Sequence, residues 1–139
     1  QPMGYFTTSV HQLLQSKAEK KEDGSWDLAK ASVIKNGKGE EFGKIVVVDV
    51  EVVKEVATLE LTLEGVGLVD KQGIFDIVND PFYIVETPVK NGSEIKWLKI
   101  YRSSKFDDID KPRWHPAVLN LQDLCQGNLD KPIRISWFD

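Results

Sequence analysis

The feature that most constrains the fold of this chain is an alternation of apolar and polar residues. In the segment 43–54, one face of an extended chain would carry the valines Val46, Val48, Val50 and Val52, and the opposite face would carry acidic side chains. The segment 59–63 repeats the pattern with Leu59, Leu61 and Leu63. A period of two is typical of a β-strand with one buried face. The chain is therefore expected to form a sheet that covers an aliphatic core.

The same criteria, applied to the whole sequence, predict eight strands. These are residues 4–10, 26–32, 43–54, 59–63, 80–90, 95–104, 117–124 and 132–139, with one helical turn expected at 10–15. Asn91 and Gly92, between two of these strands, form a strong hairpin turn signal. Many short strands with polar connections favour an all-β fold, an eight-stranded antiparallel β-sandwich.

Length, charge and cysteine content restrict the class of protein. A chain of 139 residues can bury one core, and the polar stretches 16–24 and 36–43 are too short to separate two, so residues 1–139 are expected to form a single domain. The net charge of −4 argues against a nucleic-acid partner. The single Cys125, with no secretory signal, favours a reducing, cytoplasmic setting. No apolar run reaches the roughly 18 residues of a membrane span, so membrane contact would be peripheral.

Three motifs in the second half of the chain occur in the order typical of one family. They are Asn79-Asp-Pro-Phe82, Lys111-Pro-Arg-Trp-His-Pro116 and Leu121-Gln-Asp-Leu-Cys-Gln-Gly-Asn128. With them the chain resembles a C2 domain, and most of all the second C2 domain of copines. The resemblance implies a C2-like Greek-key sandwich that docks on membranes.

The order of the segments differs from that family. A segment like 3–10 normally follows the strand matched here by 132–139, yet in this chain it lies at the other end. The resemblance therefore implies a circularly permuted domain, or a piece that spans two tandem C2 domains. We expect 5–10 to pair with 133–138, as the C2 order would place them, and closing the circle in this way would bring Gln1 and Asp139 close together.

The resemblance also implies a calcium site, because carboxylates from two loops of a C2 domain converge on the ion. Asp80 and Asp139 match two of these positions, and Asp70 and Asp76 are further candidates. Gly73 stands where an acidic ligand is expected, and the loop that supplies two more falls at the chain ends. Calcium binding is therefore expected to be weak or absent, with a dissociation constant above about ten micromolar. The alternative is that these aspartates only cap loops.

A lipid-binding face is predicted on the strand at 95–104. Alternation would turn Leu98 and Ile100 toward the core. The same alternation would point outward Trp97, Lys99 and Tyr101, with charge added at the strand ends by Lys96 and Arg102. Aromatic rings beside a lysine suit an anionic headgroup. The alternative is an ordinary solvent-facing strand whose aromatic rings pack beside lysine stems.

The remaining motifs indicate structure rather than catalysis. Trp114 is expected to fill the core under a connecting loop, Cys125 to be a buried core residue, and His115 to be exposed. No nucleophile, base and orienting group occur together, so an enzyme is not expected. The sequence predicts a peripheral module that binds anionic phospholipid with weak or no calcium dependence. The alternative is a protein-interaction module on the same sandwich.

Overall fold

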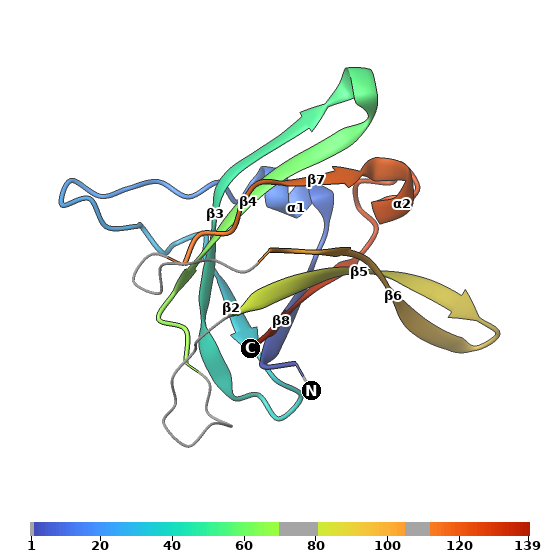
Figure 1. Ribbon diagram of the computed structural model, residues 1–139, viewed down its shortest axis with the longest axis horizontal. Coiled ribbons are helices and arrows are strands. Elements are labelled where there is room, and N and C mark those ends of the chain that lie inside the picture. The colour runs from blue at the N-terminus through green and yellow to red at the C-terminus, as the bar shows by residue number, and fades with distance from the viewer. Residues whose placement is uncertain (1, 70–80, 105–111) are drawn as a thin grey trace.

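The structure of the chain is a computed structural model that describes residues 2–69, 81–104 and 112–139 (Figure 1). The described part is mostly β. Its strands are β1 (Gly4–Thr8), β2 (Ser32–Lys35), β3 (Glu41–Val53), β4 (Thr58–Val66), β5 (Phe82–Asn91), β6 (Glu94–Arg102), β7 (Ala117–Asn120) and β8 (Ile133–Phe138). The helices are short: α1 (Val10–Leu14), the 3-10 turn η1 (Lys54–Val56) and α2 (Leu121–Cys125).

The eight strands form one antiparallel, nearly closed, barrel-like sheet, so the predicted number and direction of strands are confirmed. Their order is β6-β5-β8-β1-β2-β3-β4-β7. One link in this order is thin, because β1 and β2 are joined by the single pair of Tyr5 and Lys35. The sheet is therefore nearly divided into two groups of four strands.

The two ends of the chain meet in the middle of the sheet, as the sequence predicted. β1 pairs with β8 in an antiparallel ladder that runs from Gly4 opposite Trp137 to Thr8 opposite Ile133. The backbone N–H of Met3 extends this ladder by donating to the Trp137 carbonyl at 2.7 Å. Figure 1 shows the two chain ends close together. The predicted neighbour Gln1 lies outside the described residues.

The core is built from the alternating residues of the sheet and closed by aromatic rings. The leucines at 59, 61 and 63 are all buried, as expected. Trp114 is buried too, where its indole N–H donates to the Pro81 carbonyl at 2.9 Å. Its ring lies edge-on to Tyr83, with 5.6 Å between the ring centroids. The predictions of a structural Trp114, a buried Cys125 and an exposed His115 are confirmed.

The predicted strand at 26–32 is wrong, because the chain turns there before it extends. The Asp27 carboxylate accepts a hydrogen bond from the Ala29 backbone N–H at 2.9 Å, and the Ala31 N–H donates to the Leu28 carbonyl at 3.1 Å. Such local bonds favour turns over strands. The strand β2 begins only at Ser32.

The predicted strand at 117–124 is half right. β7 ends at Asn120, whose side chain caps α2 by accepting a hydrogen bond from the Asp123 backbone N–H at 3.1 Å. Asparagine is a favoured N-cap residue. The apolar residues that follow therefore pack on the core from a helix, with Leu121, Leu124 and Cys125 buried.

Within the described ranges, no helix is long and apolar enough to cross a membrane.

Candidate functional site

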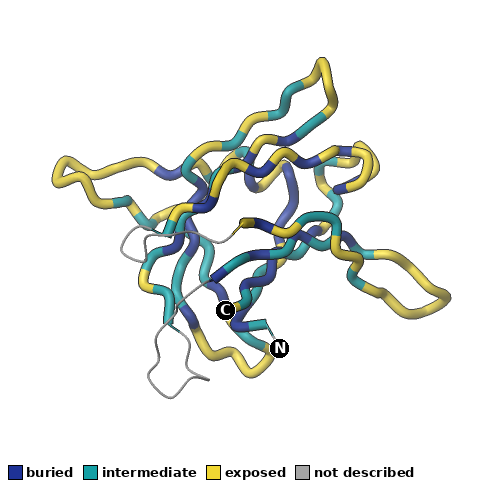
Figure 2. Tube along the Cα trace, in the orientation of Figure 1, coloured by how far each residue is buried: buried dark blue, intermediate teal, exposed yellow. Residues whose placement is uncertain are grey.

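The hairpin of β5 and β6 extends well beyond the body of the sheet (Figure 1). β5 ends at Asn91 and β6 begins at Glu94, so the predicted turn at Asn91 and Gly92 is confirmed. Gly92 has a φ of 68°, the left-handed conformation that glycine adopts without strain. Figure 2 shows the end of this hairpin as exposed. All five predicted lipid-binding residues lie on β6.

Cross-strand pairing assigns the side chains of β6 to the two faces of the sheet. Tyr83 and Val85 on β5 are buried and define the inner face. Residues directly opposite each other in an antiparallel pair share a face. Trp97 is opposite Pro88 and Lys99 is opposite Glu86, so both lie on the outer face, as predicted.

The prediction for Tyr101 is wrong, because it lies on the inner face. It is opposite Val85, and its ring centroid is 5.9 Å from that of Tyr83. The cause is an irregularity in the ladder, which leaves Ile100 without a direct partner and shifts the alternation by one residue. Tyr101 therefore packs against the core.

The two basic residues predicted at the strand ends lie on different faces. Arg102 is opposite Ile84 on the outer face, and its guanidinium carbon is 4.1 Å from the centre of the Phe82 ring. Lys96 is opposite Val89, which belongs to the inner series of β5, but both are exposed because the hairpin has left the core behind. The predicted residues therefore form no single patch.

Exposed apolar side chains on this hairpin were not predicted. Ile95 is 60% exposed, Leu98 56% and Val89 43%. Leu98 was expected in the core, and it is on the inner face as predicted. It is exposed although Thr87, directly opposite on β5, is buried, because β6 is an edge strand of the sheet. Alternation alone could not reveal this, since it gives the face of a residue and not the place of its strand in the sheet.

The hairpin is basic although the chain is acidic. Residues 82–102 contain Lys90, Lys96, Lys99 and Arg102 against Glu86 and Glu94, an excess of two positive charges in a chain of net charge −4. Among the residues that the structure describes, none of the three lysine ammonium groups forms an ion pair. Their charge is therefore available to an anionic partner.

A set of packed polar residues supports the outer face at the base of the hairpin. Arg134 on β8 binds Glu86 through two hydrogen bonds of 3.1 and 3.0 Å, and Ser136 donates to the same carboxylate at 2.8 Å. The Arg134 guanidinium carbon is 4.6 Å from the Trp97 ring centre and 5.5 Å from that of Tyr5. Trp97 is therefore held by the protein. The alternation of apolar and polar residues in 133–137 could have predicted that Arg134 lies on the outer face. It could not have predicted which residues Arg134 contacts there.

The predicted calcium ligands are mostly outside the described residues: Asp70, Asp76 and Asp80. Asp139 follows Phe138, which is opposite Phe82 at the start of β5. This end of the sheet is thus where 81–82 and 138–139 meet. In the described ranges, no group of three or more histidine, cysteine or acidic side chains could hold a metal ion. Calcium takes six to eight oxygen ligands. Because three of the four predicted ligands lie outside the described residues, the calcium site stays a prediction.

No protein-family model matches the chain, and no solved structure matches it either.

Proposed function

We propose that the chain is a peripheral module that docks on anionic phospholipid membranes through the β5–β6 hairpin, in a cytoplasmic setting. The observation that carries this proposal is that one projecting hairpin presents three exposed apolar side chains together with lysines that form no ion pair with any described residue. Val89, Leu98 and Lys96 belong to its inner face, and Ile95, Lys90 and Lys99 to its outer face. Val89, Ile95 and Leu98 would enter the headgroup region, while the ammonium groups contact lipid phosphates. Trp97 would support Arg134 rather than touch lipid.

The expected magnitudes favour reversible binding. A fully buried leucine or isoleucine contributes roughly 1.5–3 kcal/mol, and these side chains are already half covered. Each basic group near an anionic surface contributes about 1 kcal/mol. Association itself costs several kcal/mol. The hairpin is therefore suited to a weak attachment that the lipid composition controls.

We further propose that the fold is a C2-like sandwich in circularly permuted order. Two features support this. The strands fall into the groups β6-β5-β8-β1 and β2-β3-β4-β7, which share only the pair of Tyr5 and Lys35. The first strand also lies beside the last, where the resemblance would put it. Calcium would contribute weakly or not at all to docking.

A protein partner is the alternative for the same hairpin. Tyr, Trp and Arg are the residues most often found at binding hot spots, and Tyr5, Trp97 and Arg134 lie together at its base. An acidic protein surface would satisfy the same lysines. The proposal prefers lipid because the exposed residues at the hairpin end are aliphatic.

Vesicle sedimentation tests the proposal. The chain is mixed with vesicles of phosphatidylcholine alone, or with a third of phosphatidylserine, with calcium or with a chelator. We expect binding only to the anionic vesicles, and equal binding with the chelator. Leu98→Ser should weaken it about five- to tenfold, the equivalent of roughly 1 kcal/mol.

The matched control is Val118→Ser, because Val118 is 59% exposed but lies on β7 and not on the hairpin. It should bind vesicles as the parent does. Equal binding to neutral and anionic vesicles, or equal losses in the two variants, would reject the lipid proposal and favour the protein-interaction alternative.

A further inference from the structure

A polar groove runs along α1 on a part of the molecule that the docking proposal does not use. One hollow of about 450 Å³ is lined by Thr8, Gln12, Asp130 and neighbouring residues. A second, of about 380 Å³, extends toward Lys30. The two share Thr7, Thr8, Gln12 and Gln15, so they form one continuous groove, named here the α1 groove. Each hollow is within the range of small-ligand sites, about 300–1,000 Å³.

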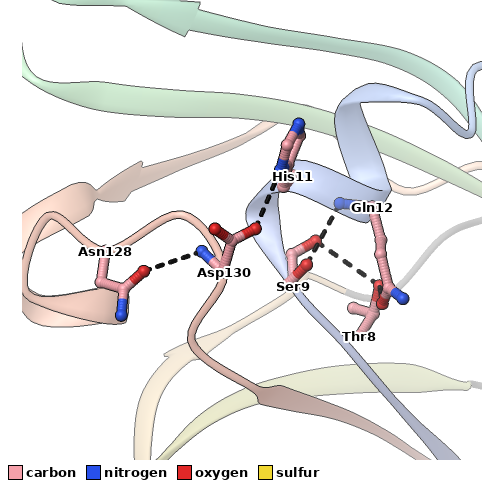
Figure 3. A network of polar contacts seen from close by, with 6 residues as sticks. All are labelled: Thr8, Ser9, His11, Gln12, Asn128 and Asp130. Atoms are coloured by element: carbon pink, nitrogen blue, oxygen red, sulfur yellow. Dashed lines mark hydrogen bonds and ion pairs between the residues drawn. The ribbon is translucent and has the colours of Figure 1, made fainter.

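Segments from both ends of the chain fix one end of the groove (Figure 3). The His11 backbone N–H donates to the Leu129 carbonyl at 2.9 Å, and its ring Nδ1 is 2.9 Å from Asp130 Oδ1. The Asp130 backbone N–H in turn donates to the Asn128 side chain at 3.0 Å. The Asp130 carboxylate and the imidazole are thus held at the entrance. This pair could not be predicted from the sequence, because 119 positions separate the two residues.

Several polar side chains along the groove can form further hydrogen bonds. Thr8 Oγ1 donates to the Gln12 side-chain oxygen at 3.3 Å, which leaves both amide hydrogens of Gln12 for another acceptor. Among the residues that the structure describes, the Gln15 amide and the Thr7 hydroxyl have no side-chain partner. A carboxamide offers a donor and an acceptor side by side, and a hydroxyl offers both.

We propose that the α1 groove binds a neutral polyhydroxylated ring, such as a hexose or an inositol. Adjacent hydroxyls of such a ring each donate and accept, which is the complement of the Gln12, Gln15 and Thr7 side chains. The charges at the groove ends are balanced, with Lys30 at one end and Asp130 at the other, so a neutral ligand fits better than an ion. Phe6 lines the second hollow and provides an apolar edge for the C–H face of the ring.

Because the groove is open to water, the ring is expected to bind weakly. A ring held by a few neutral hydrogen bonds in contact with water should bind in the millimolar range. The ring could be free in solution or carried by a glycolipid, and the chemistry of recognition is the same for both.

Amide-resolved NMR titration of the full chain tests the proposal, with D-glucose, D-galactose, D-mannose and myo-inositol as probes. At least one ring should shift the signals of Thr7, Gln12 and Gln15 in a saturable way. Gln15→Ala should weaken that binding about tenfold, the effect of about one hydrogen bond. The matched control is Gln122→Ala, since Gln122 is an exposed glutamine on the other short helix.

Three outcomes would overturn the proposal: no ring shifts the groove signals, Gln122→Ala weakens binding as much as Gln15→Ala, or only a phosphorylated ring such as glucose 6-phosphate binds. Phosphatidylcholine vesicles with galactosylceramide then separate the two sources. Recruitment that free galactose reverses assigns the lipid-borne ring, and binding of free rings without recruitment assigns the soluble one. Lys99→Glu should leave ring binding unchanged, so failure of the membrane proposal is distinguishable from failure here.

Discussion

The guanidinium carbon of Arg134 lies 4.6 Å from the centre of the Trp97 ring, a contact that joins β8 to β6 across the intervening β5. Glu86 on β5 binds the same guanidinium with two hydrogen bonds. The base of the projecting hairpin is thus tied to the body of the sheet by one arginine that contacts three elements. This explains why a hairpin with few core residues near its end can keep a defined orientation.

Arg134→Ala should destabilise the fold by about 1–3 kcal/mol. The variant leaves the Glu86 carboxylate, only 15% exposed, without its cation and removes the contact with Trp97. Urea unfolding measures the loss. Lys17→Ala is the control, because the Lys17–Asp49 pair is 61% and 66% exposed and should contribute at most about 0.5 kcal/mol. Equal losses in both variants would show that the Arg134 contacts contribute nothing special.

Tyr83→Phe should leave the fold as stable as the parent or stabilise it by up to about 1 kcal/mol. The Tyr83 hydroxyl is buried and, in the part of the chain that the structure describes, has no hydrogen-bond partner. Removing such a group relieves its desolvation cost. Urea unfolding at neutral pH gives the result, and a loss above about 1 kcal/mol would show that the hydroxyl has a partner.

The same variant should reduce the sensitivity of the fold to alkaline pH. Burial raises the pKa of Tyr83, and also that of Tyr101. Above the ordinary tyrosine value of about 10, the unfolded chain loses these protons while the native protein keeps them. The free energy of unfolding is therefore independent of these groups below about pH 10 and falls above it. Tyr83→Phe should flatten that fall, and an unchanged slope would contradict the assignment.

Gly43→Ala should cost at least about 1–2 kcal/mol. Gly43 has a φ of 130°, and a Cβ there would lie 2.8 Å from the Gly67 carbonyl oxygen and 3.0 Å from the Leu68 Cα. Strain and collision both oppose the substitution. Gly37→Ala is the control, because it has no positive φ and no atom within 4 Å of a Cβ, and it should be neutral or slightly stabilising. Similar thermal midpoints for the two variants would contradict this account.

Alternation predicted most of the sheet and failed at its irregularities. The leucines of β4 face the core as expected, and β1 pairs with β8. On β3 the ladder shifts between Val47 and Asp49, so Val48 has no direct partner and the predicted face of four valines is broken. The shift near Ile100 does the same on β6 and turns Tyr101 inward. A bulge adds one residue without changing composition, so a period-two pattern cannot locate it.

For the β5–β6 hairpin, the sequence predicted which basic and aromatic residues form the candidate site but not how they are arranged. The sequence placed Trp97 and Lys99 on one face correctly, because both precede the bulge. It did not show that Leu98 is exposed or that Arg134 holds Trp97, since the first depends on β6 being an edge strand and the second on β8 lying next to β5. Similarly, the pairing of His11 with Asp130 follows from β1 lying beside β8, a contact between opposite ends of the chain.

The docking proposal makes its sharpest prediction for Lys99. Its side chain lies on the outer face of an edge strand and forms no ion pair with any described residue. Lys99→Glu removes one attraction to an anionic surface and adds one repulsion, about 2 kcal/mol in total, so vesicle binding should fall roughly thirtyfold. Parent binding should also weaken as salt rises, because charges are screened within about 10 Å at 0.1 M.

The control for this prediction is Lys38→Glu, which makes the same change of charge at an exposed position in the β2–β3 loop, away from the hairpin. Both variants give the chain the same net charge, so any effect of total charge on vesicle binding will be equal. We expect Lys38→Glu to unfold at the same urea concentration as the parent and Lys99→Glu at a slightly lower one, because Lys99→Glu places a second carboxylate directly opposite Glu86. Only Lys99→Glu should lose vesicle binding. If Lys38→Glu loses as much, the attraction is a property of the whole chain, and the hairpin is not the docking surface.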